Sequence, residues 1–294
     1  MPEVPAWVHF ATGGAGGITG WMFVHPMDVL KTRMQLLGSG GKNTGVVSLA
    51  SGILKNEGAK GLYSGLSAAM MRQVTYTTAR LGLYGSLRDL IVKPGQQATL
   101  GQRVLAGVGA GAIASSVCNP IEVCLVRMQS DGRLPKAEQR NYKHIFDALG
   151  RVAREEGILT YWRGCTPTVV RAIVVSVTQV AGYDQIKASL LNSGWFQDNM
   201  YCHLSSSVLA GFIYSAASLP FDTTKTRMQT QKPVDGKLLY TSTAQTMSHI
   251  IRNEGPKSMW KGFLPYFGRC GGHTVTMFVF VEQYKRLVNW YYKG

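Results

Sequence analysis

Apolar residues gather in long segments that recur along the chain. Three stretches without Asp, Glu, Lys or Arg contain 18 or more residues each and cover 4–27, 104–121 and 204–221. A helix of about 20 such residues crosses the hydrocarbon core of a bilayer. Three shorter apolar stretches, each bordered by arginine, cover 73–79, 172–183 and 270–281. The pattern predicts an all-α membrane protein with six transmembrane helices.

The spacing of small residues supports a membrane bundle. Pairs of small residues four positions apart lie in each long stretch: Gly13 and Gly17, Gly107 and Gly111, Ser207 and Gly211. This spacing puts both members on one helix face, where neighbouring helices can approach closely. The mean hydropathy of the whole chain is close to zero, which leaves a soluble protein with buried helices as the alternative.

The chain consists of three copies of one unit. The string at 25–35 recurs at 119–129 and at 219–229, and its prolines, Pro26, Pro120 and Pro220, are 94 and 100 residues apart. A Glu-Gly pair and then an aromatic-x-Gly turn follow in each copy; these turns end at Gly65, Gly164 and Gly262. We therefore expect repeats at 1–97, 98–198 and 199–294, arranged about a pseudo-threefold axis within one transport domain.

Each recurring string carries charges at fixed distances from its proline. A proline inside a helix removes a backbone hydrogen bond and favours a kink, which draws the three helix ends toward a common axis. Acids stand two residues after each proline, at Asp28, Glu122 and Asp222. The position three residues further on holds Lys31, Leu125 and Lys225. The acid and the base of each string can therefore meet their counterparts on neighbouring helices, and Leu125 leaves the second copy without a base.

A second set of charges lies inside the shorter apolar stretches. Arg72, Arg171 and Arg269 each follow the turn glycine of their copy by seven residues, so they lie at one depth. Charge facing lipid costs about 3 kcal/mol or more, so such residues are expected to face a polar interior. Converging guanidiniums with no acid nearby suit a small dianion, because the planar fork of arginine meets a carboxylate with two hydrogen bonds. Helical spacing adds four residues to this substrate-binding set: Tyr76, Arg80, Gln179 and His273.

Composition narrows the classes of function. The net charge of +15 requires an anionic partner, which can be lipid, nucleic acid or a small substrate. A nucleic-acid binder explains neither the apolar spans nor the repeats. The five cysteines show no metal-ligand or C-x-x-C spacing, and the chain lacks a phosphate-binding glycine loop and a catalytic triad pattern. The sequence thus predicts no enzyme, no metal and no cofactor. The first seven residues carry no basic run that would indicate a cleavable targeting peptide.

Three strings of the form P-x-[DE]-x-x-[KR], each followed by the acid-Gly and aromatic-x-Gly strings, resemble the mitochondrial carrier family over essentially the whole chain. The resemblance implies six transmembrane helices with short amphipathic matrix helices, in the inner mitochondrial membrane, with both termini facing the intermembrane space. It also implies alternating access by a monomer, and cardiolipin bound at the turns of Gly65, Gly164 and Gly262.

The same resemblance implies two gates. In the matrix gate it implies ion pairs of Glu122 with Lys225 and of Asp222 with Lys31, whereas Leu125 departs from the family pattern and leaves Asp28 without its expected partner. The gate comprises these charges with bracing glutamines, namely Asp28, Lys31, Glu122, Asp222, Lys225, Gln35, Gln129 and Gln229. The cytoplasmic gate lies near the ends of the even-numbered helices and comprises Arg88, Asp184, Lys187, Glu282 and Lys285. It is incomplete, because Gly85 stands where the first copy would carry an acid.

Several strings are similar to the subgroup of this family that exchanges 2-oxoglutarate for malate. They include 75–78, 80–82 and 131–135, together with a leucine in the basic slot of the second copy. The resemblance therefore implies an antiporter of dicarboxylates. A dicarboxylate/phosphate carrier and an uncoupling-type proton-leak carrier remain as alternatives.

Overall fold

The computed structural model describes residues 6–37, 45–92, 96–193, 200–232 and 238–293, apart from some side chains within α1, α8, α9 and α11. None of these residues forms a β-strand. The long helices are α1 (Ala6–Gln35), α4 (Leu66–Ile91), α5 (Leu100–Val117) continued by α6 (Asn119–Ser130), α8 (Cys165–Asn192), α9 (Met200–Thr230) and α11 (Phe263–Lys293). The short elements are α2 (Val46–Glu57), α3 (Ala59–Leu62), η2 (Asp131–Arg133), η3 (Lys136–Glu138), α7 (Ile145–Glu155), η4 (Ile158–Trp162), α10 (Thr243–Glu254) and η5 (Pro256–Trp260).

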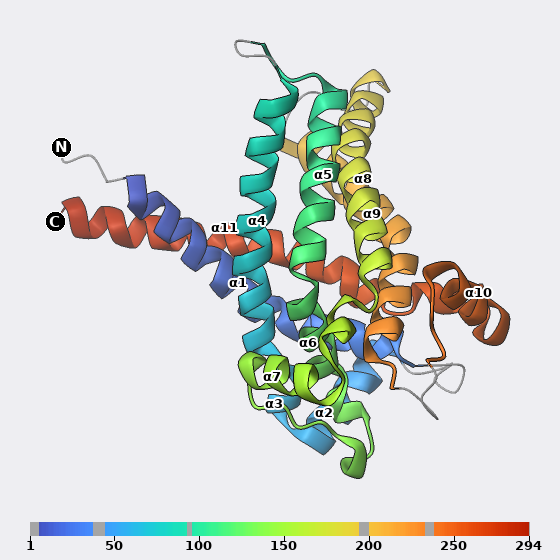
Figure 1. Ribbon diagram of the computed structural model, residues 1–294. Coiled ribbons are helices and arrows are strands. Elements are labelled where there is room, and N and C mark those ends of the chain that lie inside the picture. Colours follow the sequence, from blue (N-terminus) through green and yellow to red (C-terminus); the bar gives the residue numbers. More distant parts are fainter. Residues whose placement is uncertain (1–5, 38–44, 93–95, 194–199, 233–237, 294) are drawn as a thin grey trace.

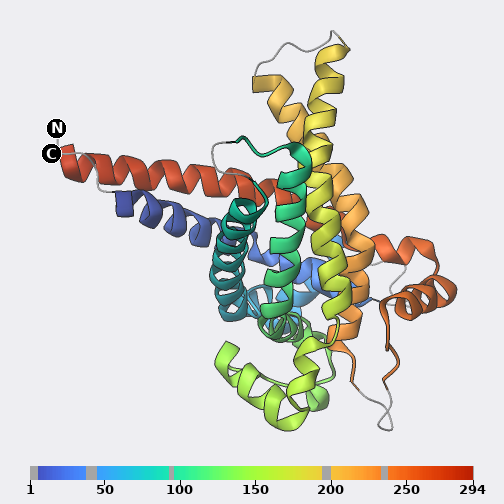
Figure 2. The same cartoon turned by 45° about the horizontal axis from the view of Figure 1, so that its top comes forward.

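The order of elements repeats three times: a long helix, short helices, and a second long helix. Helices α4, α5, α8 and α9 lie side by side, while α1 packs along α11 and this pair runs away from the other four (Figures 1 and 2). The short helices α2, α3 and α7 gather at the end of the bundle where α6 lies (Figure 1). The six helices therefore converge at one end, where the proline-containing strings lie, and separate toward the other.

The three prolines have different local consequences. Helices α1 and α9 continue through Pro26 and Pro220, whereas the second repeat breaks at Cys118, just before Pro120. Pro120 stands in the first turn of α6, where its missing N–H costs no helical hydrogen bond. The preceding helix, α5, is started by a capping box in which Thr99 and Gln102 bond each other's backbone.

The hydropathy of the individual helices is modest. No single helix among the described residues combines the length and apolar character of a membrane span, although α5 and the segment Asn119–Arg133 do so together, bent by 64°.

In each repeat a buried arginine links the proline-containing helix to the Glu-Gly string that follows it. Both terminal nitrogens of Arg33 bond the two carboxylate oxygens of Glu57, and Arg227 binds Glu254 in the same way. In the second repeat, Arg127 donates to Glu156 at 2.5 and 2.9 Å, and its side chain is fully buried. This bidentate geometry holds the Glu-Gly string of each repeat against the end of its long helix.

The same arginines join each repeat to the next. The Nε of Arg33 donates to the backbone oxygen of Gln129 at 3.0 Å, and that of Arg127 donates to the oxygen of Gln229 at 3.0 Å. The Nε of Arg227 completes the circle at the oxygen of Gln35, 3.1 Å away. Three equivalent bonds thus close a ring of repeats at this end of the molecule. The sequence analysis missed these arginines, although each recurs seven residues after its proline.

The turn glycines are required by conformation and by close packing. Gly65, Gly164 and Gly262 precede α4, α8 and α11. Their φ angles are positive, from 74° to 86°, and residues other than glycine rarely adopt such angles. A Cβ on Gly164 would lie 2.9 Å from Cγ of Gln229, and one on Gly262 would lie 3.2 Å from the backbone oxygen of Lys31. Each turn therefore packs directly on the long helix of the next repeat.

We predict that Glu156→Gln destabilises the protein by about 2 kcal/mol, because the fully buried Arg127 would lose its charged partner. Among the described residues, the neighbouring Glu155 forms an ion pair only with Arg151, on the surface of α7. The matched variant Glu155→Gln should therefore change stability by less than about 0.5 kcal/mol. Thermal unfolding of both purified variants in detergent measures the difference. Equal unfolding temperatures for the two variants would contradict the structural role of the Arg127–Glu156 pair.

Candidate functional site

Charged side chains from all three repeats meet where the six long helices converge. Lys31 Nζ lies 2.6 Å from Oδ2 of Asp222, and Lys225 Nζ lies 2.6 Å from Oε1 of Glu122. These are the two ion pairs that the family resemblance implies. All four residues lie beyond the proline of their own repeat, and each pair joins two different repeats.

The three equivalent arginines are not free of acids, which corrects the expectation from sequence. Arg72 Nε lies 3.0 Å from Glu122, Arg171 Nε lies 3.2 Å from Asp222, and Arg269 Nε lies 3.1 Å from Asp28. The reason is geometric: convergence brings the motif acids to the depth of the arginines, one repeat further on. Eight residues therefore form what we call the charge cluster: Asp28, Lys31, Arg72, Glu122, Arg171, Asp222, Lys225 and Arg269.

Asp28 differs from the other two acids in its surroundings. Glu122 and Asp222 each contact one lysine and one arginine, whereas Asp28 forms an ion pair only with Arg269 among the described residues. Leu125, in the slot of the missing base, is buried in an apolar group that includes Trp21 and Met128. The leucine thus removes one lysine–acid pair, as the sequence predicts, while Arg269 still compensates Asp28.

The charge cluster carries an excess of positive charge. It contains five cationic side chains and three carboxylates, leaving two positive charges uncompensated within it. The space enclosed among these side chains is about 60 Å³, room for a few water molecules. An excess of two positive charges in such a confined space favours the binding of a dianion when the cluster opens.

An aromatic ring supports two of the cations. Lys31 Nζ lies 4.0 Å from the ring centroid of Tyr266, and the guanidinium carbon of Arg269 lies 5.0 Å from it. Tyr266 is fully buried, and its hydroxyl contacts those of Tyr214 at 2.8 Å and Ser218 at 3.2 Å. The hydroxyl contacts hold the Tyr266 ring in place, and cation–π attraction to that ring holds Lys31 beside Asp222. The equivalent positions in the other repeats are Ala69 and Thr168, so repetition gives no signal for Tyr266.

The three glutamines of the recurring strings contact neutral groups of neighbouring repeats. Gln129 Oε1 accepts a hydrogen bond from Thr32 at 2.7 Å, and Gln35 Oε1 accepts one from Thr226 at 2.9 Å. Gln229 donates to Asn119 at 3.4 Å, because Val126 stands where the other repeats have a threonine. Within the described part of the chain, the glutamines therefore brace hydroxyl and amide groups beside the ion pairs.

The remaining substrate-binding candidates lie on α4, α8 and α11, the second long helix of each repeat. The guanidinium carbon of Arg72 lies 5.4 Å from the ring centroid of Tyr76, on the next turn of α4. Tyr76 and Arg80 both line a cavity beside the charge cluster. The side chains of Gln179 and His273 lie outside the described residues.

The predicted cytoplasmic gate lies at the end where the helices separate. Arg88 pairs with the adjacent Asp89, and Glu282 lies 3.5 Å from Arg286 on its own helix. Lys187 also has a partner. The side chains of Asp184 and Lys285 lie outside the described part. Arg88 and Glu282 thus pair within their own helices.

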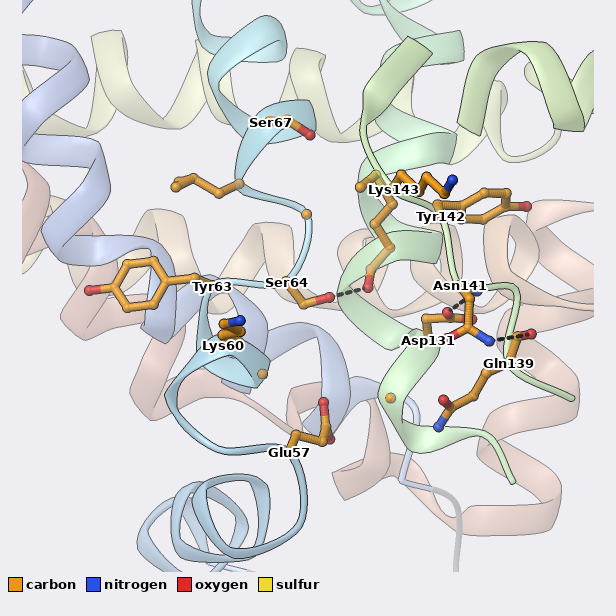
Figure 3. A pocket seen from close by; sticks show the side chains of 15 residues that line it. Glu57, Lys60, Tyr63, Ser64, Ser67, Asp131, Gln139, Asn141, Tyr142 and Lys143 are labelled. Carbon is orange, nitrogen blue, oxygen red and sulfur yellow. Dashed lines mark hydrogen bonds between the residues drawn. The ribbon is translucent and has the colours of Figure 1, made fainter. Parts of the chain in front are cut away.

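The turn of the first repeat borders a cavity of about 590 Å³ on the outside of the converging helices. Figure 3 shows Tyr63 and Ser64 on one side of it and Asn141, Tyr142 and Lys143 on the other. Ser64 donates to the backbone oxygen of Met128 at 2.6 Å, which anchors the turn to α6 (Figure 3). Burial raises the pKa of the Tyr142 hydroxyl, so this side chain stays a neutral donor.

We predict that Tyr266→Leu lowers the thermal stability of the purified protein by about 3 kcal/mol, because it removes a fully buried ring and the support of Lys31. Tyr266→Phe keeps the ring and loses only the hydroxyl contacts, so a loss of about 1 kcal/mol is expected. Unfolding in detergent with both variants separates the two contributions. A larger loss with phenylalanine than with leucine would overturn this assignment.

The comparisons with known proteins agree with this arrangement. The family model of the mitochondrial carrier protein matches residues 2–95, 96–194 and 196–292. The chain is 47% identical over 292 residues to the mitochondrial 2-oxoglutarate/malate carrier protein of Mus musculus, covering 96% of this chain and 93% of that protein. The Caenorhabditis elegans protein of the same name is 45% identical over 282 residues, covering 95% and 92%. The mitochondrial uncoupling protein 5 of Arabidopsis thaliana is 37% identical over 302 residues, covering 95% and 96%. Three matched segments and relatives aligned over almost their full length show that this chain belongs to the mitochondrial carrier family.

Proposed function

We propose that the protein exchanges 2-oxoglutarate for malate across the inner mitochondrial membrane by alternating access. The observation that carries the proposal is the charge cluster, whose two excess positive charges match the two negative charges of each substrate. Full-length similarity to carriers named for this pair of substrates supports it. The transport itself makes and breaks only non-covalent contacts, so the protein is not an enzyme.

The geometry suggests how binding loosens the matrix gate. Arg72, Arg171 and Arg269 each hold a gate carboxylate at 3.0 to 3.2 Å. A substrate carboxylate can take the place of a gate carboxylate on an arginine, since the two groups have the same charge and the same fork-shaped geometry. A displaced Glu122 or Asp222 then keeps its lysine as the only cationic partner in the charge cluster. A displaced Asp28 keeps no cationic partner there. Substrate binding therefore removes one of the ion pairs through which a gate acid joins two repeats.

The same exchange of partners accounts for obligatory antiport. Glu122 and Asp222 are buried, and an unpaired buried charge costs several kcal/mol. Opening the gate without a dianion would leave both the acids and the arginines without partners. A bound dianion offsets this cost and so gives the transition between the two states its differential binding energy.

The membrane arrangement follows the same proposal. The six long helices cross the inner membrane, with both termini toward the intermembrane space and the short helices in the matrix. The arginines inside the bundle lower the mean hydropathy of these helices, although they face the interior and not the lipid. A helix with such an arginine can therefore cross the membrane despite its modest hydropathy. Cardiolipin phosphates bind at the Gly65, Gly164 and Gly262 turns, where the cavity beside Gly65 is bordered by Lys60 and Lys143. Since all three acids have partners within one chain, the protein functions as a monomer.

The first experiment measures uptake of labelled 2-oxoglutarate into liposomes that contain the purified protein and are loaded with malate, with phosphate or with no substrate. Uptake is expected only with malate inside, and Arg171→Ala should reduce it by about 100-fold, because Arg171 contacts both the gate and the substrate. The exposed Arg154 on α7 provides the matched control, and Arg154→Ala should transport normally.

The other outcomes identify the rivals. Equal uptake into phosphate-loaded vesicles would indicate a dicarboxylate/phosphate carrier. Proton conductance without any dicarboxylate would indicate an uncoupling carrier. Substantial uptake into empty vesicles would contradict obligatory exchange.

Leu125→Lys tests the balance of charge. The added lysine would stand opposite Asp28 and raise the excess charge of the cluster from two to three. It would also complete the third lysine–acid pair of the gate. We expect exchange of 2-oxoglutarate to fall by about tenfold, which corresponds to about 1.4 kcal/mol of additional stabilisation of the closed gate. Leu125→Met preserves size and neutrality and should leave the rate within about twofold. The two initial rates of malate-driven uptake provide the comparison.

A further inference from the structure

A second space for a small anion lies beside the charge cluster. A cavity of about 400 Å³ is enclosed by α4, α5 and α8, toward the end where the helices separate. Its polar lining comprises Tyr76, Thr77, Arg80 and Tyr84 of α4, Arg103 of α5 and Ser176 of α8. No acidic residue lines it within the described part of the chain. The cavity is more than six times as large as the space inside the charge cluster.

The two arginines of this cavity differ from those of the charge cluster in having no partner. Among the described residues, neither the side chain of Arg80 nor that of Arg103 forms a hydrogen bond or an ion pair, although the backbone N–H of Arg103 donates to the oxygen of Thr99 at the start of α5. Arg103 is exposed and Arg80 is partly buried, so both guanidinium groups are accessible to an anion that enters the cavity, and each offers several N–H donors to a carboxylate. By contrast, Arg72, Arg171 and Arg269 each already lie beside a carboxylate.

Tyr76 connects the two spaces. Its side chain lines the cavity, and its ring faces the guanidinium of Arg72 at 5.4 Å. Arg72 in turn contacts Glu122 of the gate. The ring of Tyr76 therefore lies between an anion held by Arg80 and Arg103 and the guanidinium of Arg72. At Arg72 the anion can displace the carboxylate of Glu122.

We propose that Arg103 and Arg80 form an entry site that captures one carboxylate of the dicarboxylate before it reaches the charge cluster. This inference rests on the proposed exchange and adds Arg103, which precedes the apolar stretch 104–121 and is not among the substrate-binding residues predicted from the sequence. Binding occurs in two steps. The substrate first enters the roomy cavity and then exchanges partners with the gate acids, in a space that opens only as they leave.

The first test removes the charge. Arg103→Gln should raise the KM for 2-oxoglutarate by about tenfold and leave kcat within about twofold, because the residue acts in capture and not in gate opening. Arg103→Lys keeps a point charge and should recover part of the affinity. A merely structural role would instead lower the amount of active carrier, and thus kcat, without raising KM.

The second test fills the cavity without changing any charge. A Cβ on Gly107, which lines the cavity, would meet no atom within 4 Å, so Gly107→Leu places its side chain in open space. This variant should also raise KM by about tenfold. Gly101 lies on the same helix, is exposed, lines none of the described cavities and has the same free surroundings. Gly101→Leu is therefore the matched control and should transport like the wild type.

The outcomes separate the inference from the proposed function. Wild-type exchange together with unchanged KM in both Arg103→Gln and Gly107→Leu would overturn the entry site and leave the exchange function standing. If the wild type does not exchange dicarboxylates, both proposals fail. If Arg103→Gln does not fold, Gly107→Leu against Gly101→Leu decides the question alone.

Discussion

The buried carboxylates of the recurring strings set the main constraint on this structure. Glu122 and Asp222 are almost fully buried, and each is held by a lysine from one repeat and an arginine from another. A carboxylate in such surroundings must keep a cationic partner, because its desolvation is not recovered otherwise. The convergence of the helices, the depth of the arginines and the excess of positive charge all depend on this requirement.

Two of the kinds of contact that join the repeats involve charged side chains, and they differ in how readily they change. Arg33, Arg127 and Arg227 are fixed by two glutamate oxygens and one backbone oxygen each, and nothing in the cavities described here competes for them. The charge cluster, by contrast, consists of contacts that another carboxylate can replace. The bonds of Arg33, Arg127 and Arg227 are thus suited to hold each helix end to the Glu-Gly string of its own repeat. The charge cluster is suited to open. A single recurring string supplies both, with the base of the cluster and the arginine of the ring two residues apart.

Repetition explains what the sequence predicts and what it leaves out. The three recurring strings identify the repeats, the two lysine–acid pairs and the loss of the third pair at Leu125, because each depends on a position compared across copies. The pairing of Arg72 with Glu122 was missed, since it joins residues 50 positions apart on different repeats and depends on the depth at which the helices converge. Tyr266 was missed for the opposite reason: it occurs in one repeat only. Gln179 and His273, whose side chains lie outside the described part, remain predictions.

The ring of arginine bonds makes the connection between the repeats cyclic, although the chain itself is linear. Every repeat donates to the next, and the third donates to the first at Gln35. Helices α1 and α11, which belong to the first and third repeats, lie side by side as closely as helices that are joined by a loop (Figure 2). The three arginine bonds are therefore equivalent and do not depend on which repeat comes first in the sequence. A circularly permuted chain that begins near Thr99, with its former ends connected, would contain every bond of the ring.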